Sequence, residues 1–294
     1  MKNLTYNLTK GLMYLLSLLP FWVLYRISDL LYLFVFYLIR YRRPLVRKNL
    51  RNSFPDKTEK ERRRIEKDFY AFFCDYIVET VKILSIPPEK MKRHMEFIGF
   101  EQMEDALTRH TSCFLYLGHY CNWEWIASIP LWCSQPDIHF AQLYHPLHSP
   151  LFDRLFLELR GRFGGENVRK QDALRHILNY NRNKQKNVVG FISDQTPRWV
   201  NIHEWVTFLN QDTPVFIGTE RIGKKVDAAI FFCDITRPKR GYYRAVLRPM
   251  TEDIRSYPDY ELTALYMREL EACIRRAPAF WLWTHNRWKR QRTQ

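Results

Sequence analysis

Residues 113–124 read CFLYLGHYCNWE. The first five are apolar and predict a buried strand that ends at Gly118, and a helix is expected soon after it. His119 and Glu124 therefore flank a strand-to-helix turn. An imidazole beside an orienting carboxylate is the arrangement needed to deprotonate a hydroxyl group for acyl transfer. The same spacing also fits a capped helix with a structural histidine, so the rest of the chain has to decide between the two.

Strands and helices alternate along the chain from this turn in both directions. Strands are predicted at 95–100, 113–117, 138–143, 187–192, 227–233 and 242–247, and helices at 101–109, 121–129, 150–163, 172–184, 213–223 and 260–275. Pro130 is expected to stop the helix that follows His119, and 198–213 is expected to be an irregular loop. This alternation predicts a single α/β domain with a mostly parallel central sheet flanked by helices.

The N-terminal part of the chain is unlike a soluble domain. Residues 11–39 are almost wholly apolar, with breaks at Pro20 and at the cluster from Arg26 to Asp29, which divide them into 12–25 and 30–39. Neither half has the roughly 20 apolar residues of a spanning helix. We expect a helical membrane anchor, either one long spanning helix or two interfacial or re-entrant helices. The alternative is a buried helical hairpin of a soluble domain.

A basic cluster without acidic residues follows the apolar segment. It consists of Arg40, Arg42, Arg43, Arg47, Lys48 and Arg51. Such a cluster is typical of the cytoplasmic side of a membrane, where it meets anionic headgroups. We therefore expect an anchor with a basic juxtamembrane segment in 1–52 and an α/β acyltransferase domain in 53–294. The protein should stay with membranes in a cell extract at moderate salt.

The composition of the 294 residues limits the classes of molecule that the protein is expected to bind. The net charge of +15 indicates anionic partners, and the aromatic content of 16%, with nine tryptophans, is typical of contact with a membrane interface. Zinc-finger and RNA-binding signatures are not found, so nucleic acid is not expected. The six cysteines are scattered without a C-x-x-C pair, which indicates reduced thiols in a protein that faces the cytosol.

A second polar pair also follows a predicted strand. Asp194 and Gln195 come directly after 187–192, as His119 comes after 113–117. Because ligands gather at the carboxyl ends of parallel strands, we expect these side chains to share one cleft. Asp194 and Gln195 would bind acceptor hydroxyls or hold Arg160, unless they only form a cap or turn.

Separated motifs resemble the late lipid A biosynthesis acyltransferases, the lauroyl- and myristoyl-transferring branch of the lysophospholipid acyltransferase superfamily. They are the apolar anchor with RRPLVRKNL at 42–50 and Phe54-Pro55, Gly118-His119 with Asn122-Trp123-Glu124, Tyr144 with Pro146-Leu147, Arg160 with Gly164, Asp194-Gln195, and PAFWLWTHNRWK at 278–289. They keep the family's order over almost the whole chain. A Phe-Pro-Glu-Gly-Thr-Arg-like block of the phosphatidic-acid type is not found, which favours the lipid A branch.

The resemblance implies acyl transfer from a thioester, carried by acyl carrier protein or coenzyme A, to a hydroxyl of a glycolipid, with no cofactor or metal. His119 would be the general base and Glu124 would orient its ring. Asn122 or the backbone amides at the helix start after His119 would stabilise the oxyanion, and Trp123 belongs to the same motif. The enzyme would lie on the inner membrane with its catalytic domain facing the cytoplasm.

Three further residues are candidates for contacts with substrate. Arg160 would bind the oxyanion or a sugar phosphate, or would be a solvated arginine on a helix face. Tyr144 would line the acceptor pocket or only pack. Arg287 would form a basic mouth for lipid phosphates with Lys289 and two tryptophans, Trp283 and Trp288, or those tryptophans would pack a C-terminal element instead.

Rival interpretations remain open. The chain can instead be a lysophospholipid acyltransferase of general membrane synthesis or a non-catalytic membrane-binding protein. Cys121, two residues from His119, can act as a thiol nucleophile. His139, His145 and His148 lie close together in sequence, although their spacing is not a known metal-ligand pattern.

Overall fold

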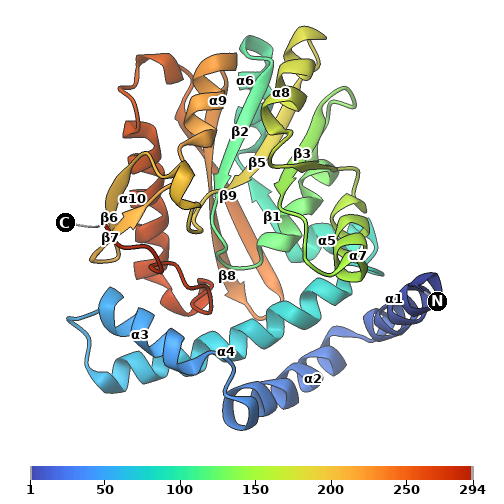
Figure 1. The fold of residues 1–294 in the computed structure, drawn as a ribbon. Helices are drawn as coiled ribbons and strands as arrows, with labels where there is room; N and C mark the ends of the chain where they lie inside the picture. Colours follow the sequence, from blue (N-terminus) through green and yellow to red (C-terminus); the bar gives the residue numbers. More distant parts are fainter. Residues whose placement is uncertain (1, 293–294) are drawn as a thin grey trace.

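The computed structural model describes residues 2–292, with side chains from residue 4 onward, and shows one seven-stranded sheet (Figure 1). Its strands are β1 (Met95–Ile98), β2 (Ser112–Leu117), β3 (His139–Tyr144), β4 (Glu166–Arg169), β5 (Asn187–Ile192), β8 (Ala229–Lys239) and β9 (Tyr242–Thr251), in the order β1-β9-β8-β2-β5-β3-β4. The strands β8, β2, β5, β3 and β4 run parallel to one another, whereas β9 is antiparallel to β8. The predicted α/β class with a mostly parallel sheet is confirmed.

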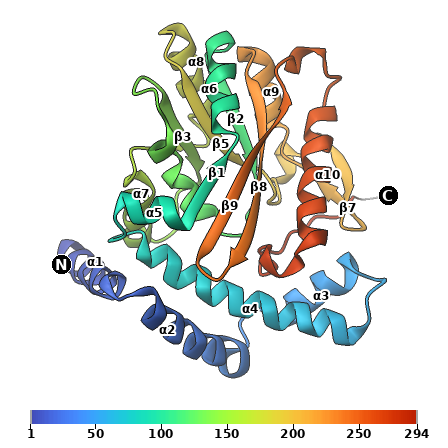
Figure 2. The same cartoon turned by 180° about the vertical axis from the view of Figure 1, so that it is seen from behind.

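Helices cover both faces of this sheet (Figures 1 and 2). They are α5 (Pro88–His94), α6 (Phe100–Arg109), α7 (Pro150–Gly161), α8 (Ala173–Arg182), α9 (Gly218–Val226) and α10 (Glu261–Arg276). The long helix α4 (Glu59–Lys82), which begins with the Thr58/Glu61 capping box, lies across the carboxyl ends of the parallel strands. The central strand β2 is buried along its whole length, which is why its sequence is continuously apolar.

Three local predictions are wrong. The segment 198–213 is not only a loop, because it contains the hairpin of β6 (Trp205–Phe208) and β7 (Gln211–Pro214), and the helix expected from residue 213 begins at Gly218. The hairpin turns at Leu209 and Asn210, both with positive φ, and this pair lacks the glycine that usually marks such a turn. Pro130 does not end the helix after His119, because the element is a 3₁₀ helix, η2 (Trp123–Trp132), that continues past it.

The apolar N-terminal segment forms two α-helices and a π-helical turn. These are α1 (Lys2–Leu18), α2 (Phe21–Leu33) and η1 (Phe34–Ile39), followed by α3 (Arg43–Ser53). The break falls at Pro20 alone, and α2 continues through 26–29, where the sequence predicted a second division. One helical stretch, Phe21–Ile39, is long and apolar enough to cross a membrane by length and composition. In the structure α2 lies alongside α4 (Figure 2).

Candidate active site

The turn that carries His119 is built by close packing and by the C-terminal segment. A Cβ atom at Gly118 would lie only 2.7 Å from a methyl carbon of Leu270, so a larger residue does not fit where β2 leaves the sheet. The backbone of Leu282 donates to the carbonyl of His119 over 3.2 Å, and the backbone of Cys121 donates to the carbonyl of Phe280 over 2.9 Å. These contacts hold His119 at the carboxyl end of β2.

Asp194, and not Glu124, is the carboxylate that holds the His119 ring. Its Oδ1 lies 2.6 Å from Nδ1 of His119, and its Oδ2 accepts hydrogen bonds from the His119 backbone amide at 2.9 Å and from Trp281 Nε1 at 2.8 Å. The expectation that Glu124 orients the ring is corrected, because β2 and β5 are neighbours and their carboxyl ends bring His119 and Asp194 together. We expected His119 and Asp194 to share one cleft, and the two side chains do lie together in the structure.

The electrostatics of this pair favour an ionised carboxylate. Burial alone would raise the pKa of Asp194, but the adjacent His119 and the hydrogen bonds from His119 and Trp281 lower it to about 2. The ionised Asp194 therefore accepts a hydrogen bond from Nδ1–H of His119, and in the neutral imidazole this leaves the lone pair on Nε2. That Nε2 lies 3.2 Å from the side-chain nitrogen of Gln195, which donates to it. The His119 side chain is 19% exposed, so Nε2 is accessible to a small polar group that displaces the amide.

Glu124 has a different partner. Arg160 from α7 donates to both of its carboxylate oxygens, at 2.7 and 2.6 Å, and the Tyr76 hydroxyl lies 3.3 Å away. Burial opposes ionisation of Glu124, but the Arg160 charge and hydrogen bonds keep its pKa below the ordinary value. The Arg160 side chain is 24% exposed whereas that of Glu124 is 3% exposed, so the pair presents its cation toward solvent.

Asn122 is fully buried and does not reach the cleft. Its amide nitrogen donates to Glu79 on α4 at 2.8 Å, and its oxygen accepts from the backbone of Trp125, which caps η2. The predicted oxyanion role of Asn122 is therefore corrected to a structural one. Trp123 stacks on Tyr76 with ring centroids 4.2 Å apart and meets the His119 ring edge-on at 5.2 Å.

Arg287 does not form a basic mouth either. It is fully buried, donates to the carbonyl of Pro214 over 2.6 Å, and has its pKa lowered to about 10 by burial. Trp283 and Trp288 donate to Pro278 and Thr213 inside the protein. The C-terminal block, residues 278–289, thus packs into the protein, with Trp283 in the core and Trp288 partly buried against it.

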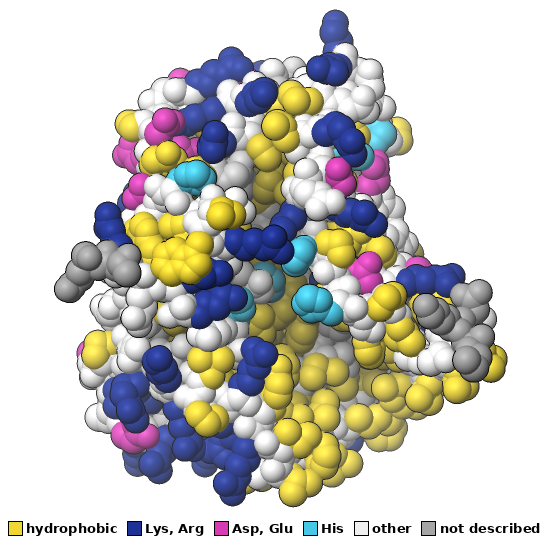
Figure 3. Space-filling model, in the orientation of Figure 1, with side chains coloured by type: hydrophobic (Ala, Val, Ile, Leu, Met, Phe, Trp, Pro, Cys, Tyr) yellow, Lys and Arg dark blue, Asp and Glu magenta, His cyan; other side chains and the backbone are white. Residues whose placement is uncertain are grey.

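The rim of the site is cationic. Tyr144 ends β3, and its carbonyl accepts from the backbone of Lys170, which follows β4. The exposed His145 lies near Lys170 and Arg198, and burial together with these two charges lowers its pKa. Figure 3 shows the face hollowed at its centre, with histidine, lysine and arginine side chains around the hollow and hydrophobic ones extending below it.

Two rival sites find no support in the geometry. The thiol of Cys121 is fully buried and lies 3.5 Å from the carbonyl of Ile235, and burial raises its pKa well above the ordinary value, so it is not an activated nucleophile. His139 instead lies 3.5 Å from Glu166. Within residues 2–292, no three His, Cys, Asp or Glu side chains gather in a way that would hold a metal ion.

One residue near the site was missed by the sequence reasoning. His285 lies behind Asp194 and next to Thr196, and burial is the main cause that lowers its pKa to about 4, so it is neutral near pH 7. In the sequence, His285 was marked only by its position within the tryptophan-rich segment 278–289. We expected that segment to form a basic opening for lipid phosphates.

A carboxylate-held histidine at the carboxyl end of the central strand of an open α/β sheet is placed where such sheets bind ligands, and it has the geometry of a general base. The sequence profile of the bacterial lipid A biosynthesis acyltransferases matches residues 2–290. The chain belongs to this family and is an acyltransferase of lipid A biosynthesis.

Individual relatives agree with the profile. The chain is 25% identical over 289 residues to the lipid A biosynthesis lauroyltransferase of Escherichia coli K12, an alignment that covers 95% of this chain and 89% of that protein. It is 22% identical over 270 residues to a lipid A biosynthesis acyltransferase of Haemophilus influenzae, covering 92% and 82% of the two chains. The myristoyltransferase of E. coli K12 is 26% identical over 139 residues, covering 47% of this chain and 41% of that protein.

Proposed function

We propose that the protein moves a fatty acyl chain from an acyl thioester to a hydroxyl group of a lipid A precursor, with His119 as the general base and Asp194 as the residue that orients it. The observation that carries this proposal is the 2.6 Å contact between Asp194 and Nδ1 of His119, which leaves Nε2 at the cleft. His119 is thus the catalytic residue, Asp194 positions its ring, Gln195 lies at Nε2, and Glu124 positions Arg160.

The proposed reaction needs no enzyme nucleophile. The acceptor hydroxyl replaces the Gln195 amide at Nε2 of His119, gives its proton to that nitrogen, and its oxygen attacks the thioester carbonyl carbon. The tetrahedral intermediate then collapses, the carbon–sulfur bond breaks, and the thiolate takes the proton from the imidazolium. Asp194 stabilises that imidazolium, as the aspartate does in a serine hydrolase triad.

Arg160 and Gln195 are the donors that we assign to the substrate. Glu124 fixes two of the guanidinium nitrogens of Arg160, so the arginine is held in one orientation at the edge of the cleft. From there it would stabilise the oxyanion or a sugar phosphate, and the displaced Gln195 amide would donate to the same oxygen. Tyr144 and Trp123 would line the acceptor side.

The proposal also specifies where the protein lies in the cell and which molecule donates the acyl chain. Residues 1–52 attach the protein to the cytoplasmic side of the inner membrane, and 53–294 form the catalytic domain. The net charge of +15 favours an acidic acyl carrier protein as the donor, with coenzyme A as the alternative carrier.

Purified protein and His119→Ala should be assayed with an acyl thioester against a lipid A precursor and against lysophospholipids. Loss of a positioned base typically lowers a rate by about 10²–10⁴, so the variant should be nearly inactive while its circular dichroism is unchanged. Substantial transfer by a folded His119→Ala variant refutes the mechanism. Faster transfer to lysophospholipids than to the glycolipid refutes the assignment of a lipid A precursor as the acceptor.

The length of the transferred acyl chain is measured in cells. Lipid A from cells with and without the protein should differ by one acyl chain in its mass profile, and the mass difference gives the chain length.

A further inference from the structure

The N-terminal helices expose a continuous apolar side. The exposed side chains include Leu4, Leu8, Leu12, Leu15 and Leu18 of α1, Trp22, Leu30 and Leu33 of α2, and Phe34, Tyr37, Leu38 and Ile39 of η1. Figure 3 shows hydrophobic side chains continuing from the central hollow over this lower part of the molecule. A patch of this extent on a monomer marks a contact with another apolar phase.

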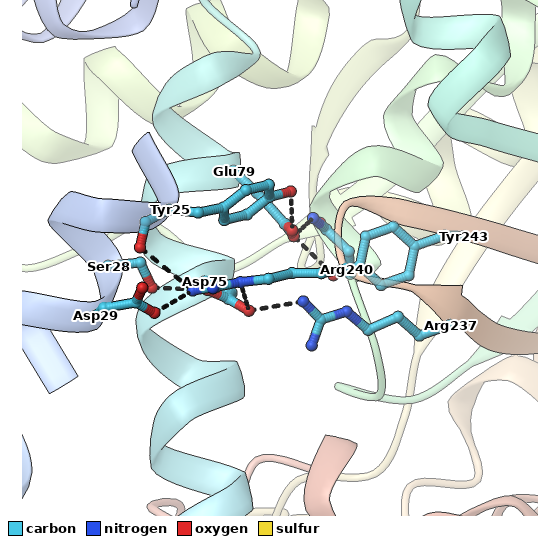
Figure 4. Close-up of polar contacts among 9 residues, drawn as sticks. Tyr25, Ser28, Asp29, Asp75, Glu79, Arg237, Arg240 and Tyr243 are labelled. Atoms are coloured by element: carbon cyan, nitrogen blue, oxygen red, sulfur yellow. Dashed lines mark hydrogen bonds and ion pairs between the residues drawn. The ribbon is translucent and has the colours of Figure 1, made fainter. Parts of the chain in front are cut away.

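The opposite side of α2 is bonded to the catalytic domain. Figure 4 shows α2 beside α4, with the Tyr25 hydroxyl donating to Glu79 at 2.9 Å and the Ser28 hydroxyl donating to Asp75 at 2.7 Å. Asp29 of α2 accepts from Arg240 at 2.7 Å, and Arg240 lies in the turn between β8 and β9. Three residues within about one helical turn therefore fix α2 to two other elements.

These bonds lie within the first half of Phe21–Ile39, the stretch that is long enough to span. Asp75 is 3% exposed and also accepts from Arg237 at 2.6 Å, so the cluster contains the carboxyl groups of Asp29, Asp75 and Glu79 and two guanidinium groups. A spanning α2 would either carry this cluster and the β8–β9 turn into hydrocarbon or break away from it. Lipid-exposed turns do not occur in the hydrocarbon region, and a carboxylate left buried without its partners is costly.

Exposed cations border the apolar side, one of them within α2 and the others after η1. Arg26 is 81% exposed at its side chain, Arg40 and Arg42 follow η1, and Lys48 and Arg51 lie on α3. Leucine and aromatic side chains on one face with lysine and arginine at its border are typical of helices that lie in the interface of an anionic membrane.

We propose that α1, α2 and η1 lie in the plane of one membrane leaflet and do not cross it, with an anionic phospholipid surface as the partner of their apolar side. This inference rests on the membrane attachment in the proposed function and specifies its geometry. It places the carboxyl ends of the parallel strands, and with them His119, at the side of the domain that faces the leaflet (Figure 1). A lipid acceptor then reaches the base from the membrane surface.

Sidedness is the first test. Single cysteines at Asn7→Cys in α1 and Arg64→Cys in α4 are introduced into a Cys133→Ser background, since the other native cysteines are buried. The full-length protein is bound to sealed vesicles of phosphatidylethanolamine and phosphatidylglycerol, purified by flotation and treated with a membrane-impermeant maleimide. Both sites should react from the same side. Reaction of residue 7 only after the vesicles are opened overturns the proposal.

Depth is the second test. Leu30 is the midpoint of Phe21–Ile39, so a nitroxide at Leu30→Cys would lie about 15 Å deep in a spanning helix. In the plane of the leaflet it should lie about 5–10 Å deep, similar to labels at Trp22→Cys and Leu38→Cys. A label at Leu174→Cys on α8 is the matched control and should remain in water.

The outcomes separate the two proposals. Failure to float with vesicles contradicts the membrane attachment itself and with it this geometry. Flotation with Leu30 at the bilayer centre contradicts only the in-plane geometry and leaves the acyl transfer and its catalytic residues unaffected.

Discussion

The contact between Asp194 and His119 makes a specific kinetic prediction. Asp194→Asn removes the charge that stabilises the imidazolium and allows the amide to favour the wrong tautomer, while the shape of the side chain is kept. We expect kcat to fall by about 10²–10⁴ with a much smaller change in KM for the acceptor. Initial rates at saturating glycolipid measure this.

Cys121→Ser is the matched control for that variant, because it changes a buried side chain in the same turn without touching the His119 ring. It should retain its activity. A drop in Cys121→Ser comparable to that in Asp194→Asn would point back to thiol chemistry.

The sequence could locate this site but could not assign its carboxylate. His119 was recognisable because it directly follows a continuous apolar strand, and Asp194 because it follows another. Glu124 seemed the partner because it is five residues away, whereas the actual partner is 75 residues away in the chain. The order of strands decides which ends meet, and that order depends on packing between elements far apart in sequence. The burial of Asn122 and Arg287 depends on the same packing.

The ion pair between Glu124 of η2 and Arg160 of α7 predicts that removing the arginine destabilises the protein more than removing the charge of the glutamate. Arg160→Met leaves Glu124 buried and unpaired, which should cost about 3–5 kcal/mol of unfolding free energy. Glu124→Gln should cost less, because Arg160 can turn to solvent from its 24% exposed position. Denaturant unfolding of both variants measures the difference.

The double variant Glu124→Leu/Arg160→Met removes both members of the ion pair. It leaves no charge behind and should be more stable than Arg160→Met alone. A double variant less stable than Arg160→Met would mean that the pair fills space and does not act through its charges.

Glu79 connects α4 with three other elements and predicts a pH dependence of stability. It accepts hydrogen bonds from Tyr25 of α2, Asn122 of the catalytic turn and Tyr243 of β9, while Arg237 and Asp75 are the charges near it. Burial raises the pKa of Glu79 to about 7, above the value of about 4.3 in an unfolded chain.

The folded protein therefore holds the Glu79 proton more tightly than the unfolded chain does. Its stabilising contribution is complete below about pH 4 and is lost as the pH rises to about 7, by roughly 3 kcal/mol. Relative to Glu79→Gln, the native chain should lose unfolding free energy over this interval. If the unfolding free energies of the native chain and of Glu79→Gln change by the same amount over this pH interval, the raised pKa of Glu79 is contradicted.

Elements with a regular pattern were predictable, and elements held by tertiary contacts were not. The strand 187–192 and the helix from about 260 were predicted close to their observed bounds because their apolar residues follow one period. The β6–β7 hairpin was missed because Phe208 and Leu209 are buried against the C-terminal block, which compensates for the absence of a glycine in the turn. Pro130 was misleading because a 3₁₀ helix packed against β1 continues past it.

The whole molecule combines an apolar side with a large positive charge. The apolar side lies on the N-terminal helices, while lysine and arginine side chains surround the hollow and cover the neighbouring surface (Figure 3). A lipid acceptor would therefore approach the apolar side, and an acidic donor protein would approach the lysine and arginine side chains. Only the approach of the donor protein should depend on charge.

A salt series with two donors tests this division. For acyl carrier protein, kcat/KM should fall about tenfold or more between about 0.05 M and about 0.5 M salt, because the Debye length shrinks and long-range attraction to the +15 chain is screened. The value of kcat at saturating donor should change little, because screening acts on encounter. An uncharged acyl thioester of N-acetylcysteamine is the matched donor and should show a nearly flat response. Equal salt dependence for both donors would place the effect on acceptor binding, and a flat response for acyl carrier protein would exclude charge as the basis of donor recognition.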